Sequence, residues 1–518
     1  MSAYLPRFSA ARAGRNLISV APGFFAGMLA SLGLSPFGYW PISLVAFALV
    51  LWFVAEAPAG AAAFRRALAC GMGYFALALN WIVDPFLVQP EIFGWMAPFA
   101  LLLMALGGGM FWAIPGWVAW HAGRGVSLRA LGFAACLVLS DWLRGWIFTG
   151  FPWALNGQIW VETPIAQLAA YCGALGLSSV TVVAAVLPVA LGPTRRGIIT
   201  GTIASALFLA ACWGLGSWRM AAPLPPDLAR TVRLVQPDAV QARKWDPQWA
   251  GVFYGRMLDL TAAPGRDGRR PDLVIWPETA VNFLLEQPGD ELLRIAQAAQ
   301  GARVVIGVQS GRNGEYFNSL AEITPAGQTG AIYDKFHLVP FGEYLPWGKQ
   351  LRRFGINAFA AQLGSGFTPG AGPRVLQLGD LPPVQPLICY EVIFPDHLRG
   401  DDERPGWLLQ ATNDAWFGTW TGPWQHLAQA RLRAIESGLP LLRVANTGVS
   451  AVIDARGRVR QQLGLGTVGL IDTALPAALP PTPFIRWGDW WVPLDAALAV
   501  LLVAVAARRR TPRKSGGL

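Results

Sequence analysis

Charged side chains are scarce in this 518-residue chain. Asp, Glu, Lys and Arg make up 14% of the residues, whereas hydrophobic residues make up 53%. Soluble globular proteins average about 25% charged residues, so this composition excludes a water-soluble surface over the whole chain. The 24 tryptophans agree, because indole rings favour the boundary between lipid and water. The composition predicts an integral membrane protein.

Histidine and cysteine are also rare, with four and five copies. The histidines are scattered and make no short-range pair with one another or with a cysteine, so we expect no zinc site, no other metal and no cofactor. Cysteines 70, 136, 172 and 212 lie inside apolar runs, where cysteine usually acts as a small buried hydrophobe. Cys389 is the one cysteine in the polar part of the chain, which therefore holds no internal disulfide partner.

The basic excess, a net charge of +10, does not indicate nucleic-acid binding, because the basic residues collect at the ends of apolar runs. Such clusters usually mark cytoplasmic loops. We therefore expect both termini and the basic loops 56–66, 121–129 and 193–196 in the cytoplasm.

Apolar runs long enough to cross a bilayer, which takes about 20 residues, predict eight spans. They lie near 17–34, 40–55, 67–83, 92–120, 130–148, 163–192, 197–217 and 489–507. The fifth contains Asp141 and Arg144, which are spaced to pair on one helical face. Few other ionisable residues fall inside the spans, which argues against a transporter or channel.

Three parts follow from this pattern. Residues 1–217 are expected to form a membrane bundle of seven spans, and 489–518 an eighth span with a basic cytoplasmic tail. Residues 218–488 then lie on the opposite side of the membrane. Short β-branched runs alternate with helical patterns there, which predicts an α/β domain with a buried sheet.

Three predicted strands of this domain end in unusual polar residues: Glu278 after a Leu-Val-Ile-Trp-Pro run, Lys335 after Tyr-Asp, and Cys389 after Leu-Ile. Ligands of open α/β sheets bind beyond the carboxyl ends of strands, so the three side chains are expected to meet. Cysteine attacks as a thiolate and needs a base to form it. Glu278 would accept the thiol proton, and Lys335 would stabilise an oxyanion.

Sequence context strengthens this interpretation. Trp-Pro-Glu278, Tyr-Asp-Lys335-Phe-His-Leu-Val-Pro-Phe-Gly-Glu343-Tyr and Ile-Cys389-Tyr-Glu resemble the Glu-Lys-Cys motifs of the nitrilase, or carbon–nitrogen hydrolase, superfamily. The resemblance implies an α-β-β-α sandwich, a covalent thioester intermediate, and a supporting role for Glu343. Tyr390 and Glu391, which follow the nucleophile, also match the superfamily, and Glu391 would orient the loop through backbone hydrogen bonds.

A domain of this kind placed between a seventh and an eighth span resembles the apolipoprotein N-acyltransferase family over essentially the whole chain. Further matching stretches begin at Gly150, Lys244, Asn413, Gly422 and Arg443. The resemblance implies transfer of the sn-1 acyl chain of a phospholipid, typically phosphatidylethanolamine, to the N-terminal amine of a diacylglyceryl-cysteine apolipoprotein. It also implies a bacterial inner membrane protein whose catalytic domain faces the periplasm. A membrane-tethered amidase or nitrilase, with water as the acceptor, is the alternative.

Apolar and aromatic segments near the predicted site suggest how lipid would be held. Phe359 and Phe367 lie in an uncharged, glycine-bearing stretch, and Trp416 begins an aromatic, turn-rich one. These stretches are expected to form a lid at the lipid interface. Trp153 and Trp245 are further candidates for binding acyl chains or headgroup edges.

Overall fold

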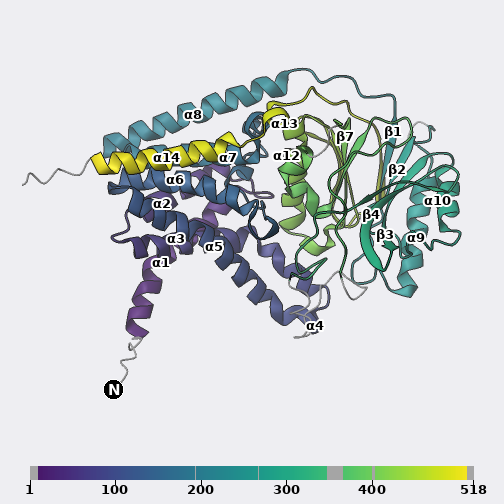
Figure 1. Ribbon diagram of the computed structural model, residues 1–518, viewed down its shortest axis with the longest axis horizontal. Helices are drawn as coiled ribbons and strands as arrows, with labels where there is room; N and C mark the ends of the chain where they lie inside the picture. Colours follow the sequence, from purple (N-terminus) through teal and green to yellow (C-terminus); the bar gives the residue numbers. More distant parts are fainter. Residues whose placement is uncertain (1–9, 193, 266–267, 347–365, 400–402, 510–518) are drawn as a thin grey trace, which may run out of the picture.

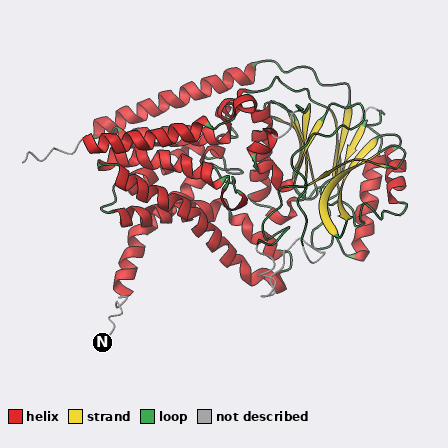
Figure 2. Ribbon diagram, in the orientation of Figure 1, coloured by secondary structure: helices red, strands yellow, loops and turns green. Residues whose placement is uncertain are grey.

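The computed structural model describes residues 10–192, 194–265, 268–346, 366–399 and 403–509. A helical bundle lies on one side of the molecule and a region with two β-sheets on the other (Figures 1 and 2). The long bundle helices are α1 (Ala10–Ser31), α2 (Trp40–Ala55), α3 (Gly60–Ala78), α5 (Ala97–Ala122), α6 (Gly125–Arg144), α7 (Ala169–Ala190), α8 (Arg195–Ala221) and α14 (Trp491–Arg509).

Each of the eight predicted spans overlaps one of these helices, but fewer are long enough to cross a bilayer. Within the described residues, five helical stretches qualify by length and hydropathy, and a sixth qualifies if α3 and the 3₁₀ helix Asn80–Leu87, bent by 48° from it, are one span. The remaining two are α2 and the part of α1 from Val20 to Ser31, which are shorter apolar stretches. At 1.5 Å per residue a 16-residue helix such as α2 falls short of the roughly 30 Å hydrocarbon core. Length therefore supports five or six spans.

The described strands form two sheets. The first has the order β11-β1-β2-β3-β4-β5, and the second has the order β10-β9-β8-β7-β6. Three consecutive strands are parallel in each sheet: β1, β2 and β3 lie inside the first sheet, and β8, β7 and β6 run to the edge of the second. The bounds are β1 Thr231–Gln236, β2 Leu273–Ile275, β3 Arg303–Arg312, β4 Glu315–Ile323, β5 Thr329–Asp334, β6 Val384–Ile388, β7 Trp407–Thr412, β8 Leu441–Ala445, β9 Ser450–Ile453, β10 Val459–Leu463 and β11 Gly469–Ala474.

Helices cover both outer faces of the paired sheets. Helices α9 (Pro247–Ala262) and α10 (Glu291–Ala299) pack on the first sheet, and α12 (Gly422–Ser437) packs on the second and faces the bundle (Figure 1). This arrangement confirms the predicted α-β-β-α sandwich. Strands β6, β7 and β8 are buried along their whole length, because both faces of the sheet are covered. The polar residues Gln385, Gln410 and Arg443 inside them are hydrogen bonded within the protein.

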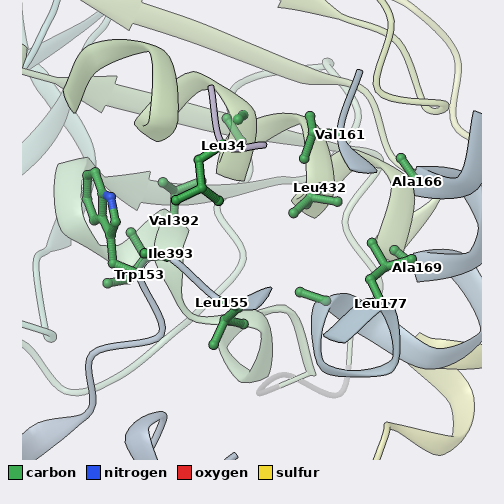
Figure 3. Packing of buried hydrophobic residues seen from close by; sticks show 14 of the residues in the cluster. Leu34, Trp153, Leu155, Val161, Ala166, Ala169, Leu177, Val392, Ile393 and Leu432 are labelled. Carbon is green, nitrogen blue, oxygen red and sulfur yellow. The ribbon is translucent and has the colours of Figure 1, made fainter. Parts of the chain in front are cut away.

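The bundle and the sandwich share one hydrophobic core. Buried side chains of the bundle pack directly against residues that follow β6 and against α12 (Figure 3). The contributors from the bundle include Trp153, Leu155, Val161, Ala169 and Leu177, and those from the sandwich include Val392, Ile393 and Leu432. The two parts are therefore fixed relative to each other by apolar contact.

The predicted Asp141–Arg144 pair is confirmed. The two side chains are buried and their charged groups lie 3.0 Å apart at the end of α6. Arg144 also donates to the carbonyl oxygens of Phe151 (3.1 Å) and Trp153 (2.6 Å), while Asp141 accepts from the Asn156 backbone N–H at 3.0 Å. This pair thus holds the loop 150–156, which enters the shared core.

Candidate active site

Three strand ends bring Glu278, Lys335 and Cys389 to one buried region. Glu278 comes shortly after β2 and Lys335 directly follows β5, both in the first sheet, whereas Cys389 directly follows β6 in the second. The residues are 6%, 1% and 4% exposed. The site therefore lies between the two sheets, where the predicted strand ends converge.

Lys335 is held between two carboxylates. Its Nζ lies 2.8 Å from Glu343 Oε2 and 3.6 Å from Glu278 Oε1. The Asn318 side chain on β4 bridges the same two carboxylates, donating to Glu278 at 2.7 Å and to Glu343 at 3.0 Å. Burial by itself would lower the pKa of Lys335, but Glu343 and Glu278 outweigh it and raise that pKa above its ordinary value. The lysine is therefore a permanent cation.

Glu278 is positioned from two further directions. Its Oε2 accepts the backbone N–H of Asn413 at 2.8 Å. The buried Lys244 donates to the backbone carbonyl of Glu278 at 3.3 Å and to the Thr279 hydroxyl at 3.2 Å. Burial lowers the pKa of Lys244 to about 8, although Glu278 opposes that shift. The carboxylate thus has a fixed orientation and a second ammonium group nearby.

Cys389 occupies an unusual backbone conformation. Its φ is +48°, in the left-handed region that non-glycine residues seldom adopt, and strain of this kind concentrates at functional sites. Burial raises the pKa of the Cys389 thiol well above its usual value, Glu278 raises it further, and Lys335 opposes both. The resting group is accordingly a neutral thiol, which needs a base at the moment of attack.

Glu391 fixes the turn that carries Cys389. It is fully buried and accepts hydrogen bonds from the Tyr333 hydroxyl (3.0 Å) and from the backbone N–H groups of Phe336 (2.8 Å), His337 (3.2 Å) and Ile388 (2.7 Å). Burial raises its pKa to about 7, while these backbone bonds and Lys335 lower it. Glu391 thereby ties the segment after Lys335 to the segment before Cys389.

A buried polar network lies behind the Cys389 carbonyl. The ring of His426, on α12, lies with Nε2 3.0 Å from that oxygen and Nδ1 2.9 Å from Asp414 Oδ1. Arg443 pairs with Asp414 and donates to Gln410 Oε1 at 2.5 Å. The main chain of the nucleophile is therefore backed by side chains from β7, β8 and α12.

The other predicted site residues occupy different environments. Tyr390 is buried and donates its hydroxyl to the Gly150 carbonyl at 3.1 Å. Trp153 is fully buried, and its indole N–H donates to Gln425 at 2.6 Å. Trp245 and Trp416 are half-buried. A lipid tail would reach Trp153 only after these contacts rearranged.

The predicted lid is partly described. The backbone N–H of the half-buried Phe367 donates to the Glu343 carbonyl at 2.9 Å, which places this residue beside the carboxylate cluster. Phe359 and most of the stretch that contains it lie outside the described residues. Among the residues that are described, no three His, Cys, Asp or Glu side chains are grouped so as to hold a metal ion.

Several contacts of the site had no counterpart in the sequence reasoning. Asn318 and Gln410 are single polar residues inside buried strands, and His426 lies in a helix of ordinary composition. Their partners come from distant parts of the chain. The strongest available indication was that His426 lies in a stretch matched to the family, Gly-Pro-Trp-Gln-His.

Models of known protein families match both the N-terminal half and the C-terminal half of the chain. Residues 26–187 match the model of the apolipoprotein N-acyltransferase N-terminal domain, and residues 231–480 match the carbon–nitrogen hydrolase model. Among solved structures, a carbon–nitrogen hydrolase superfamily protein of Xanthomonas campestris is 24% identical, with a TM-score of 0.34, and the match covers 52% of this chain and 97% of that one.

Curated relatives match over nearly the full length. Apolipoprotein N-acyltransferase of Rhizobium meliloti is 39% identical, and the match covers 93% of this chain and 95% of the relative. The proteins of the same name from Sinorhizobium fredii and Brucella melitensis are each 37% identical, over 94% and 93% of this chain and 95% and 94% of their own lengths. The chain therefore belongs to the apolipoprotein N-acyltransferase family.

Proposed function

We propose that this protein is the membrane acyltransferase that completes bacterial lipoproteins, with Cys389 as nucleophile, Glu278 as proton acceptor and Lys335 as oxyanion partner. The observation that carries the assignment is the burial of these three groups together, on a sandwich that shares its core with a membrane bundle. A reaction between two lipid-bearing substrates suits a site built against such a bundle.

In the first half of the proposed reaction, the Cys389 sulfur attacks the carbonyl carbon of the sn-1 ester of a phospholipid. Glu278 takes the thiol proton as the C–S bond forms, and Lys335 stabilises the oxyanion. The C–O bond then breaks, Glu278 returns the proton to the departing oxygen, and a lysophospholipid leaves. The acyl chain remains on Cys389 as a thioester. We expect phosphatidylethanolamine as the usual donor.

In the second half, the N-terminal amine of a diacylglyceryl-cysteine apolipoprotein attacks the thioester. The C–N bond forms and Glu278 accepts a proton from the nitrogen. The C–S bond then breaks, and Glu278 passes that proton to the departing sulfur, which regenerates the thiol and the carboxylate. Glu343 holds Lys335 in place through a contact of 2.8 Å in both halves of the reaction. Asn318 does the same for Glu278 through a hydrogen bond of 2.7 Å. We assign Glu343, Tyr390 and Glu391 to this support of the catalytic groups.

Exclusion of water decides whether the amine or water receives the acyl group. The low exposure of Cys389, Lys335 and Glu278 favours the amine, since a dry site disfavours hydrolysis. We propose that Trp245, Trp416, Phe359 and Phe367 line the lipid path, and that Trp153 supports the site from within the core. The amidase alternative is not favoured, because the full-length relatives are named acyltransferases.

Acyl-enzyme trapping tests the assignment. Purified protein is incubated with phosphatidylethanolamine carrying a labelled sn-1 chain, quenched in acid and digested, and the labelled peptide is identified by mass spectrometry. We expect the label on Cys389 as a hydroxylamine-sensitive thioester, and none in Cys389→Ala. Glu278→Gln and Lys335→Ala should form it at least about 1,000-fold more slowly, because each removes a group that acts in the transition state.

Cys212→Ala serves as the matched control, since this buried cysteine lies in the membrane helix α8, and its labelling should equal that of the wild type. A label on any other residue, or undiminished labelling of Cys389→Ala, would overturn the mechanism. Release of free fatty acid at the same rate with and without a diacylated lipopeptide would instead favour water as acceptor.

A further inference from the structure

A small cavity lies where the membrane bundle meets the sandwich. It is lined by the segment around the 3₁₀ helix Pro164–Leu168, by Met220 at the end of α8, by α12, and by the turn between β9 and β10. Its volume is about 80 Å³. Because one water molecule takes about 30 Å³ of liquid, the cavity has room for a group of a few heavy atoms but not for an acyl chain.

The lining of the cavity is strongly basic. It contains the guanidinium groups of Arg431, Arg456 and Arg458 against the single carboxylate of Glu162. Glu162 forms an ion pair with Arg431, so its charge is already balanced. Asp454, outside the lining, is a second carboxylate that acts on Arg456, but burial and Arg458 outweigh it and lower the pKa of Arg456. The remaining positive charge favours an anion between the guanidinium groups.

Two of these arginines already have partners in the protein. Arg431 Nε donates to the Gly457 carbonyl at 2.9 Å, and Arg458 donates to the Met220 carbonyl. Arg456 differs, because it is 4% exposed and its Nε and Nη1 have no hydrogen-bond acceptor in the described part of the chain. Buried charged donors are normally paired, so this side chain points to an acceptor that is not part of the chain.

The cavity also lies beside the end of a candidate membrane span. Helix α8, one of the candidate spans, ends beside it. Trp218, in the last turn of α8, is 71% exposed, as expected of an indole at the lipid–water boundary. Arg219 follows it and hydrogen bonds to Gln167 of the cavity lining, which adds a fourth cation to the neighbourhood.

We propose that this cavity binds a phosphate group, with Arg456 as its principal ligand and Arg431 and Arg458 completing the positive surroundings. Guanidinium groups suit phosphate oxygens in geometry and charge, and basic pockets beside membrane helices suit lipid headgroups. The phosphate comes either from a phospholipid at the bundle surface or from inorganic phosphate. No hydrogen bond or ion pair between described residues joins the cavity lining to Glu278, Lys335 or Cys389, so the site is separate from the acyl-transfer centre.

Native mass spectrometry of the full-length protein, released from detergent, tests this inference. Phosphatidylglycerol and diacylglycerol of the same chain length are titrated in parallel, since they differ in the phosphate-bearing headgroup. We expect one phosphatidylglycerol to bind at least tenfold more tightly than diacylglycerol. Arg456→Gln should lose that tenfold preference, whereas Arg294→Gln, which alters an exposed arginine of α10, should keep it.

Competition identifies the source of the phosphate. If millimolar inorganic phosphate displaces phosphatidylglycerol, the ligand is phosphate itself, and if it does not, the ligand is a lipid headgroup. Equal binding of the two lipids, or an unchanged preference in Arg456→Gln, would overturn the proposal. Should Arg456→Gln fail to accumulate, Arg456→Lys keeps the charge but loses the planar donors, and an intermediate preference is then expected.

Discussion

At the residue scale, contacts hold the backbone of Cys389 on both its N-terminal and its C-terminal side. Glu391 accepts the N–H of Ile388 on the preceding side, and His426 Nε2 lies 3.0 Å from the Cys389 carbonyl. A left-handed φ of +48° costs a non-glycine residue on the order of 1–3 kcal/mol and persists where its surroundings impose it. These contacts supply that restraint on the backbone of Cys389.

Substitution of His426 tests the restraint. His426→Ala removes the contact with the Cys389 carbonyl and the stacking on Trp153, so we expect acyl-enzyme formation to slow by about 10- to 100-fold, the size of loss caused by small misplacements of reacting groups. The loss should fall on kcat rather than KM, because the His426 side chain is fully buried behind the Cys389 main chain. Rates are measured with the labelled phospholipid in detergent.

His426→Gln retains a side-chain N–H and should recover part of the rate, whereas His121→Ala, at an exposed position of α5, should have no effect. A wild-type rate in His426→Ala would show that the strand ends alone hold the nucleophile in place.

At this scale the sequence predicts which residues come together where they stand in a motif, whereas their catalytic roles stay predictions. Glu278, Lys335 and Cys389 stand in local contexts that single them out, and the structure brings them together. Asn318 and His426 were not predicted, because each is one polar residue whose partners are distant in sequence, up to 40 residues away for the Asn318–Glu278 bond. Only the folded arrangement of strands reveals such contacts.

At the scale of elements, the end of α6 organises a loop that supports the site. Arg144 binds three carbonyl oxygens of that loop, of Phe151, Trp153 and Ala154. Trp153 in turn stacks on His426, with ring centroids 5.6 Å apart. A charge pair in a membrane helix is thereby connected to the main chain of the nucleophile.

Arg144→Met should destabilise the protein by about 3–5 kcal/mol, because it leaves Asp141 buried without its counter-ion. Thermal unfolding in detergent micelles measures the loss. Arg294→Met breaks an ion pair with the same spacing on the exposed face of α10 and should cost at most about 0.5 kcal/mol. Equal losses in the two variants would contradict the role given to the buried pair.

Elements with continuous apolar sequence were predicted well, and those without it were not. The buried strands β1, β2, β3 and β6 to β9 each overlap a predicted run. Strand β10 was not predicted, since its centre, Arg-Gln-Gln, is exposed and carries no alternation of apolar and polar residues. The predicted span 40–55 coincides with α2, and the predicted span 17–34 overlaps α1, so the turn between the two helices was placed correctly.

At the scale of the whole molecule, we propose that residues 218–488 form the catalytic domain on the periplasmic side of the inner membrane, with both termini in the cytoplasm. The arginines at the start of α8 and at the end of α14 support this orientation. The structure holds the sandwich at one end of the bundle (Figure 1), so a single orientation applies to the entire domain.

Cysteine labelling tests the orientation. Arg294→Cys on α10 and Arg196→Cys at the start of α8 place thiols at exposed positions on the two expected sides. A membrane-impermeant maleimide, added to cells with a permeabilised outer membrane, should label Arg294→Cys and should reach Arg196→Cys only after the inner membrane is broken. The native cysteines are buried or half-buried, so the unsubstituted protein gives the background. The reverse pattern would invert the proposed topology.

The common core of bundle and sandwich (Figure 3) has a consequence for anyone wishing to study the enzyme in pieces. Val392, Ile393 and Leu432 are buried against the bundle, so a fragment that begins after α8 would present them to water and aggregate. This enzyme cannot be trimmed to a soluble catalyst. The membrane bundle forms one side of the hydrophobic core of the sandwich, so the two parts have to be expressed and purified together.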